Sequence, residues 1–124
     1  MVSLGKLLLI LGDTPFQSER VTHSINLANA ALRMSHRVSI FLFMDGVYNI
    51  LPTQRGDIFK VTSIVDELSS LSNRGARVMC CRLCVEIRGI GGTLKPDFVE
   101  VTGVGELNEE IDDSDAVLSF IGGA

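Results

Sequence analysis

The sequence predicts a three-layer α/β/α fold with a mainly parallel sheet of four to five strands. One observation is that apolar runs of strand length alternate with segments of helical periodicity along the whole chain. Another is that the first two strand candidates are apolar throughout, which is typical of strands buried on both faces of a parallel sheet. A chain of 124 residues has the size of one domain, so we expect a single domain over residues 1–124.

The first half of the chain is predicted to form strand, helix, strand, loop and helix. Residues 6–12 (KLLLILG) are the first strand and residues 37–44 (RVSIFLFM) the second. Between them, Ser18 can cap a helix whose apolar residues recur at helical spacing; these are Val21, Ile25, Ala28 and Leu32. Residues 45–57 contain Gly, Pro and Asn, which favour a loop. The second helix ends at Gly75, which can adopt the left-handed conformation; its apolar face is Val61, Ile64, Leu68 and Leu71.

The second half continues the alternation and ends on a strand. The expected elements are strands at 76–80, 98–103 and 115–122, a short helix at 81–88 ended by Gly89, a loop at 89–97 and a last helix. That last helix should bury Val104, Leu107 and Ile111 and turn an acidic face outwards. In parallel α/β folds, chemistry collects beyond the carboxyl ends of the strands. Cys80 and Cys81 fall at one such end.

Composition and charge exclude several classes of protein. No apolar run approaches the roughly 20 residues that a membrane span needs. The run at 7–11 (LLLIL) lacks a cleavage site after it and is read as a strand rather than a signal peptide. We therefore expect a cytoplasmic protein with reduced thiols and no membrane contact. Because the chain has few aromatic residues and no extended basic stripe, we expect no direct binding of nucleic acid.

All three cysteines, Cys80, Cys81 and Cys84, lie within five positions. An odd, clustered set argues against a disulfide scaffold. Residues 74–95 carry five basic side chains against one acid, whereas residues 97–115 carry eight acids and no base. The sequence therefore places a local positive charge around the thiols.

Nucleotide and metal sites are not favoured by the motifs. The first strand-to-helix turn, GDTPFQSER, lacks both glycine-rich phosphate motifs, and Asp13 would repel a phosphate. The glycine-rich segment 88–93 follows a helix instead of preceding one, which favours a turn over a phosphate site. Structural zinc usually takes two separated ligand pairs, but the chain has one C-x-x-C, and His23 and His36 lie far from it. We expect no cofactor and no metal; a metal shared between subunits is a minor alternative.

The three thiols are predicted to differ in role. Cys80 continues the buried strand and fits the core. Cys81 lies at a strand end and at a helix start, where unpaired amides and the helix dipole favour an anion, and Arg82 follows directly. With Arg77 and Arg88 also near in sequence, these surroundings lower a thiol pKa, so Cys81 is the candidate reactive sulfur. The pair Cys81 and Cys84 also has the spacing of a redox dithiol, and that alternative stays open.

Three segments carry a resemblance to a known family: KLLLILGDTP, VSIFLFMDGVYN and GARVMCCRLCVEIRGI. Over nearly its whole length the chain resembles the DsrE/DsrF/TusD-like sulfur-relay proteins. The resemblance implies a small α/β domain like flavodoxin without its flavin, assembled as a homotrimer or homohexamer. It also implies that Cys81 accepts a persulfide and hands it on. Cys84 matches a second cysteine that some members carry.

The leading hypothesis is a sulfur carrier, with sulfurtransferase as the enzyme class in question. Cys81 would take sulfane sulfur from a donor protein or small persulfide and pass it to an acceptor. Arg82 would stabilise the anion, and Asp45, Tyr48 and Asn49 would form a neighbouring loop wall. The alternatives are a dithiol/disulfide oxidoreductase that uses Cys81 and Cys84, and a non-catalytic oligomeric binding subunit.

The expected oligomer needs an apolar interface. The segment MDGVYNILPTQ carries Val47, Ile50 and Leu51 in a predicted loop. We therefore expect this segment to lie near the interface between subunits.

Overall fold

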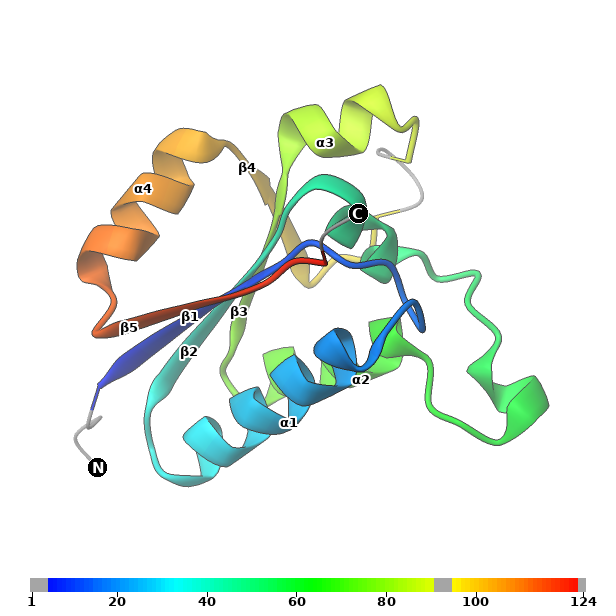
Figure 1. The fold of residues 1–124 in the computed structure, drawn as a ribbon, viewed down its shortest axis with the longest axis horizontal. Helices are drawn as coiled ribbons and strands as arrows, with labels where there is room; N and C mark the ends of the chain where they lie inside the picture. The colour runs from blue at the N-terminus through cyan, green and yellow to red at the C-terminus, as the bar shows by residue number, and fades with distance from the viewer. Residues whose placement is uncertain (1–4, 91–94, 123–124) are drawn as a thin grey trace.

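The sheet in the centre of the molecule has five parallel strands in the order β4-β3-β2-β1-β5 (Figure 1). The computed structural model describes residues 5–90 and 95–122. The strands are β1 (Lys6–Leu11), β2 (Arg37–Leu42), β3 (Arg77–Cys81), β4 (Val99–Thr102) and β5 (Ala116–Phe120). This architecture confirms the predicted α/β fold with a parallel sheet.

Helices cover both faces of the sheet (Figure 1). They are α1 (Glu19–Arg33), α2 (Ile64–Asn73), α3 (Arg82–Ile87) and α4 (Val104–Asp113). From β1 to β3, each new strand is added on the same side of the one before it. Right-handed crossovers therefore place α1 and α2 on the same face of the sheet. The connection from β4 to β5 returns across the sheet, and α4 therefore covers the opposite face. The short α3 extends from the carboxyl end of β3.

The core lies between these layers and is built from the central strands. Leu8, Leu9, Phe41 and Leu42 are fully buried, because β1 and β2 are covered on both faces. Ser18 caps α1 by accepting a hydrogen bond from the amide of Arg20, as the sequence predicts. At the edge of the sheet, β5 is largely exposed despite its apolar sequence.

The segment predicted as a loop after β2 contains two 3₁₀ helices, Met44–Ile50 and Gly56–Phe59. The predicted start of the second helix was also wrong, because α2 begins at Ile64 and Val61 lies outside it. The amide of Val61 instead bonds to the carbonyl of Gly56 and closes the second 3₁₀ helix. Its apolar side chain therefore stays half exposed.

The inner face of α4 also differs from the prediction. Leu107 is buried, but Val104 and Ile111 are 57% and 39% exposed, and Glu110 is buried instead. The carboxylate of Glu110 lies 2.6 Å from Nζ of Lys6 and also binds Arg77. A buried charge with such partners can replace an apolar residue on the inner face.

Part of the predicted glycine-rich loop, residues 91–94, lies outside the described residues. Within residues 5–90 and 95–122, no helix combines the length and the apolar character that crossing a bilayer requires.

Candidate functional site at the carboxyl end of the sheet

Cys80 and Cys81 are the last two residues of β3. Successive side chains of a strand point to opposite faces, so their sulfur atoms lie on different sides of the sheet. Cys80 is fully buried, as predicted for a core residue. Burial raises the pKa of the Cys80 thiol to about 11, which keeps it protonated at neutral pH.

Cys81 lies on the face that α4 covers. Arg77 is four residues earlier on the same face of β3, and its guanidinium binds Glu106 and Glu110 of α4. Cys81 also occupies the position that caps α3, which begins at Arg82. Its side chain is 4% exposed, so a reactant reaches it through an opening in the surface.

Cys84 lies on α3, directly beside Cys81, and is equally buried. Burial and a side-chain hydrogen bond with Cys81 raise the pKa of the Cys84 thiol. The backbone amide of Met44 donates a hydrogen bond to Sγ of Cys84 at 3.2 Å, and this bond lowers the pKa of the Cys84 thiol. The two cysteines are free thiols in one hydrogen-bonded pair.

A hollow of about 450 Å³ opens at this thiol pair. Its lining comes from the ends of β2, β3 and β4 and from α3; the residues are Phe43, Met44, Cys81, Arg82, Leu83, Cys84, Glu86, Gly103 and Val104. The apolar side chains of Met44, Leu83 and Val104 are exposed around it. We call this feature the Cys81 hollow.

Arg77, Arg82 and Arg88, which lie near the thiols in sequence, are paired with carboxylates, so the local positive charge is smaller than the sequence suggested. Arg77 lies at the opposite end of β3 from Cys81 and binds three carboxylates, so its predicted closeness to the thiols was wrong. Arg82 points its guanidinium towards Glu86, 4.0 Å away on the next turn. Arg88 binds Asp45 and donates to the backbone carbonyl of Cys84.

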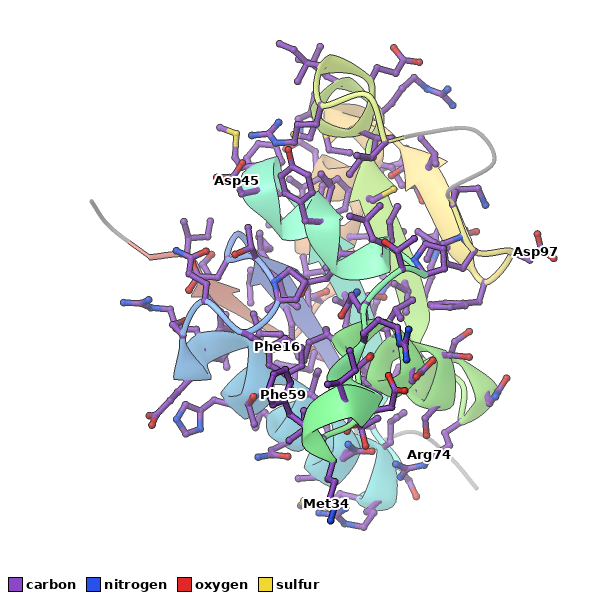
Figure 2. All side chains as sticks on the ribbon, turned by 90° about the vertical axis from the view of Figure 1, so that its right-hand side faces the viewer. Phe16, Met34, Asp45, Phe59, Arg74 and Asp97 are labelled. Atoms are coloured by element: carbon purple, nitrogen blue, oxygen red, sulfur yellow. The ribbon has the colours of Figure 1, made fainter. Side chains whose placement is uncertain are left out.

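The loop residues expected near the thiols support the site without lining the Cys81 hollow. Asp45 is held by Arg88 at 2.9 Å, and its position is labelled in Figure 2. Tyr48 packs partly buried against the core. Asn49 is fully buried, and its Nδ2 donates to the carbonyls of Asp13 and Gly46. These contacts hold the loop that supplies Phe43 and Met44.

Sequence reasoning missed the residues that follow β2 and β4. Phe43 and Met44 come directly after β2, and Gly103 and Val104 come directly after β4. The signal was available in principle, because residues that follow neighbouring parallel strands meet at the same end of the sheet. Finding them requires the strand order, which places β2 and β4 on either side of β3.

A second hollow, of about 540 Å³, lies away from the thiols. Phe16 and Phe59 face one another there (Figure 2), and Val61 completes an exposed apolar surface. Within the described residues, no group of three His, Cys, Asp or Glu side chains is arranged to hold a metal ion.

Together, the fold and the site define a small α/β protein with a buried thiol pair at the carboxyl end of its sheet. The chain belongs to the DsrE/DsrF-like family, whose model matches residues 5–120. Membership confirms the resemblance seen in the sequence. At the level of the family, it supports a role related to sulfur relay.

Individual relatives are similar to this chain over nearly its whole length. The chain is 26% identical over 115 residues to the uncharacterised protein MJ0989 of Methanocaldococcus jannaschii, covering 93% of this chain and 99% of the relative. The crystal structure of YchN from E. coli superimposes with a TM-score of 0.86 at 27% identity, covering 94% of this chain and 100% of YchN. The protein MTH1491 of Methanobacterium thermoautotrophicum gives a TM-score of 0.73 at 16% identity, covering 92% of this chain and 98% of that chain. This last likeness concerns the fold alone.

Proposed function

We propose that this chain is a cytoplasmic sulfur-relay protein in which Cys81 carries sulfane sulfur as a persulfide. The observation that carries the proposal is the hydrogen-bonded pair of Cys81 and Cys84 at the mouth of an apolar hollow. Family membership supports the same chemistry.

The transfer needs no external oxidant. The thiolate of Cys81 attacks the terminal sulfur of a donor persulfide, a new S–S bond forms, and the donor's S–S bond breaks. The donor leaves as a thiolate and Cys81 holds the persulfide. An acceptor thiolate then attacks the same terminal sulfur, and the Cys81 thiolate is released. A thiolate is the form that performs each attack.

Cys84 is proposed to assist as a hydrogen-bond donor. Its raised pKa keeps the proton on Cys84, so its S–H group can donate to the sulfur of Cys81. Arg82 is proposed to add positive charge at the outer side of the Cys81 hollow, where it lies. Asp45, Tyr48 and Asn49 are proposed to maintain the loop beside it.

A dithiol reaction of the same pair is the second candidate, favoured by the direct contact between the two thiols. If the Cys84 thiolate attacks the inner sulfur of a Cys81 persulfide, a Cys81–Cys84 disulfide forms and hydrosulfide leaves. This reaction would make the protein a dithiol/disulfide oxidoreductase. The third alternative, a non-catalytic binding subunit, requires neither reaction.

We propose a homotrimer or homohexamer, but with a different interface from the one expected in the loop after β2. Val47, Ile50 and Leu51 motivated that expectation, but Val47 and Ile50 are fully buried inside the subunit and Leu51 is partly buried against its core. Phe16, Phe59 and Val61 are exposed instead, and all three line the second hollow together with Gln54 and Arg55. Large exposed apolar surfaces commonly mark interfaces, so we place the contact between copies there.

Intact mass spectrometry after incubation with a persulfide donor tests the proposal. A sulfur carrier gains the mass of one sulfur, and peptide mapping locates the gain on Cys81. Loss of two hydrogens, mapped to Cys81 and Cys84, would favour the dithiol reaction. Loading that persists in Cys81→Ser would contradict the proposal, and Cys80→Ala is the matched control that should load normally.

A further inference from the structure

Cys81 and Thr102 occupy paired positions at the ends of two neighbouring parallel strands. In the register of β3 and β4, Cys81 lies opposite Thr102, and each is the last residue of its strand. Paired residues of parallel strands place their side chains on the same face, and neighbouring strands are about 4.8 Å apart. The side chains of Cys81 and Thr102 therefore stand beside each other.

The preceding residues give independent evidence for the shared face. Glu100, two positions before Thr102, binds Arg77, four positions before Cys81. Both belong to the face covered by α4, because Arg77 also binds Glu110 of that helix. Strand alternation then carries Cys81 and Thr102 onto this same face.

The hydroxyl of Thr102 has no hydrogen-bond partner within the described part of the chain, although its Oγ1 atom is buried. Buried polar groups are nearly always bonded, so an orphan hydroxyl in a folded protein calls for an explanation. A threonine hydroxyl can donate one hydrogen bond to a negatively charged atom. The hydroxyl next to the reactive thiol is thus a free donor.

The chain that follows Thr102 also favours an anion. Gly103 and Val104 line the Cys81 hollow, and α4 begins there without a side-chain cap at Gly103. The first amides of a helix lack partners inside the helix. The acid in the first turn of α4, Glu106, is directed to Arg77 at 2.8 Å. Glu86, which also lines the hollow, lies on α3 and reaches towards Arg82.

We propose that the Thr102 hydroxyl donates a hydrogen bond to the terminal sulfur that Cys81 carries, an inference that rests on the proposed persulfide function. In the unloaded protein, Cys81 is hydrogen-bonded to Cys84, and the Thr102 hydroxyl is unbonded among the described residues. A persulfide extends the side chain by one S–S bond of about 2.05 Å. The added sulfur then reaches the neighbouring strand, where the free donor lies.

This arrangement distinguishes the loaded from the unloaded protein. The hydrogen bond forms only when sulfur is present, so it stabilises the persulfide without affecting the free thiol. The site would then favour retention of sulfur until an acceptor enters the Cys81 hollow. The ligand it recognises is a sulfane sulfur atom in its anionic form.

The test compares wild type with Thr102→Val, which keeps the branched shape and removes the hydroxyl, and with Thr102→Ser, which keeps the hydroxyl. Each protein is equilibrated with glutathione persulfide and glutathione, and the loaded fraction of Cys81 is measured by mass spectrometry. Hydrogen bonds to charged groups predict about a tenfold fall in the loading equilibrium constant for Thr102→Val. Thr102→Ser should remain within about threefold of wild type.

A second readout separates this role from a structural one. The rate of alkylation of unloaded Cys81 should be the same in Thr102→Val and wild type. A loading constant unchanged in Thr102→Val would overturn the inference, as would an equal change in the unloaded alkylation rate. If wild type itself does not load Cys81, the proposed function fails instead. Should Thr102→Val not fold, Thr102→Ala is judged by the same two measurements.

Discussion

The backbone amide of Met44 donates a hydrogen bond to Sγ of Cys84 over 3.2 Å, and this contact joins the end of β2 to α3. Met44 makes it from a left-handed backbone conformation, with φ of 53°. Such a conformation costs a residue with a Cβ atom about 1–2 kcal/mol. The surrounding structure therefore keeps Met44 in an unfavourable backbone conformation, and in that conformation its amide reaches Cys84.

The strain at Met44 predicts the effect of two substitutions on stability. Met44→Gly and Met44→Ala both remove the half-exposed side chain, but only glycine adopts the left-handed conformation without cost. We expect Met44→Gly to be about 1 kcal/mol more stable than Met44→Ala in urea unfolding. Equal stabilities would show that the backbone at this position relaxes. Both variants keep the amide and should load sulfur normally.

The three thiols should separate in a pH-dependent alkylation experiment followed by peptide mapping. Cys80 should be the slowest at neutral pH, because burial raises its pKa to about 11. Cys81 should react fastest, because it lines the Cys81 hollow and lies at the start of α3, where unpaired backbone amides favour an anion. Cys81→Ser should abolish persulfide loading, while Cys84→Ser should slow turnover and still permit loading. Faster alkylation of Cys84 than of Cys81 would contradict the assignment.

Arg88 should tune the acidity of Cys84. Its positive charge is one of the influences that lower the pKa of Cys84, against the larger effect of burial. Arg88→Met should therefore raise the pKa of Cys84 further, seen as slower alkylation of Cys84 at a fixed pH. Arg82→Met is the comparison variant, because Arg82 also lines the Cys81 hollow but is paired with Glu86, 4.0 Å away, and should change the alkylation of Cys84 less. If Arg82→Met slowed the alkylation of Cys84 more than Arg88→Met did, Arg82 and not Arg88 would be the main positive charge that acts on Cys84.

The pair of Asp45 and Arg88 should contribute little to stability by itself. The carboxylate of Asp45 is exposed, and exposed ion pairs stabilise proteins by at most about 1 kcal/mol. A double-mutant cycle with Asp45→Asn and Arg88→Met should give a coupling within that range. A coupling above about 2 kcal/mol would indicate that the pair is shielded from water.

Glu110 should make the free energy of unfolding depend on pH. Burial acts to raise its pKa, but hydrogen bonds with Lys6, Ser39 and Arg77 outweigh burial and lower the pKa below the ordinary value of 4.5. Because the folded-state pKa is depressed, this stabilisation is present above about pH 4.5 and is lost as the pH falls through the folded-state value. Glu110→Gln should cost about 3 kcal/mol at pH 7 and flatten that acid dependence.

Glu109→Gln is the matched control for that experiment. Glu109 is the neighbouring residue on α4 and is exposed. Its replacement should change the free energy of unfolding by less than about 0.5 kcal/mol. A similar loss in both variants would mean that the net charge of α4, and not the buried pair, sets the acid dependence.

The proposed interface between copies predicts a change in oligomeric state. Phe59 is the most exposed apolar side chain of the second hollow, at 80%. A charged side chain at a buried apolar contact disfavours association, so Phe59→Lys should lower the mass measured by light scattering towards that of the monomer. Leu83→Lys, which alters the rim of the Cys81 hollow, should leave the mass unchanged. A monomeric wild type at micromolar concentration would contradict the proposed oligomer.

The sequence determined the fold class because local periodicity and strand burial are encoded in neighbouring residues. The apolar strands that contain Leu8 and Phe41 predicted a parallel sheet, and both residues are fully buried. Gly75 predicted the end of α2, and it has the expected positive φ, 106°. The position of Cys81 at a strand end and a helix start was predictable for the same reason, because that boundary is a local signal. These inferences needed no contact between distant segments.

Only the tertiary structure decided which distant groups surround that thiol. Sequence proximity suggested Arg77, but a strand of five residues carries it to the other end of the sheet. Met44 and Thr102 are far from Cys81 in sequence, yet the order β4-β3-β2 brings the ends of their strands to either side of it. The burial of the Glu110 side chain likewise depends on its ion pair with Lys6, which is more than 100 residues away in sequence. Strand order and ion pairing are properties of the folded chain, because they follow from which surfaces pack together and not from local pattern.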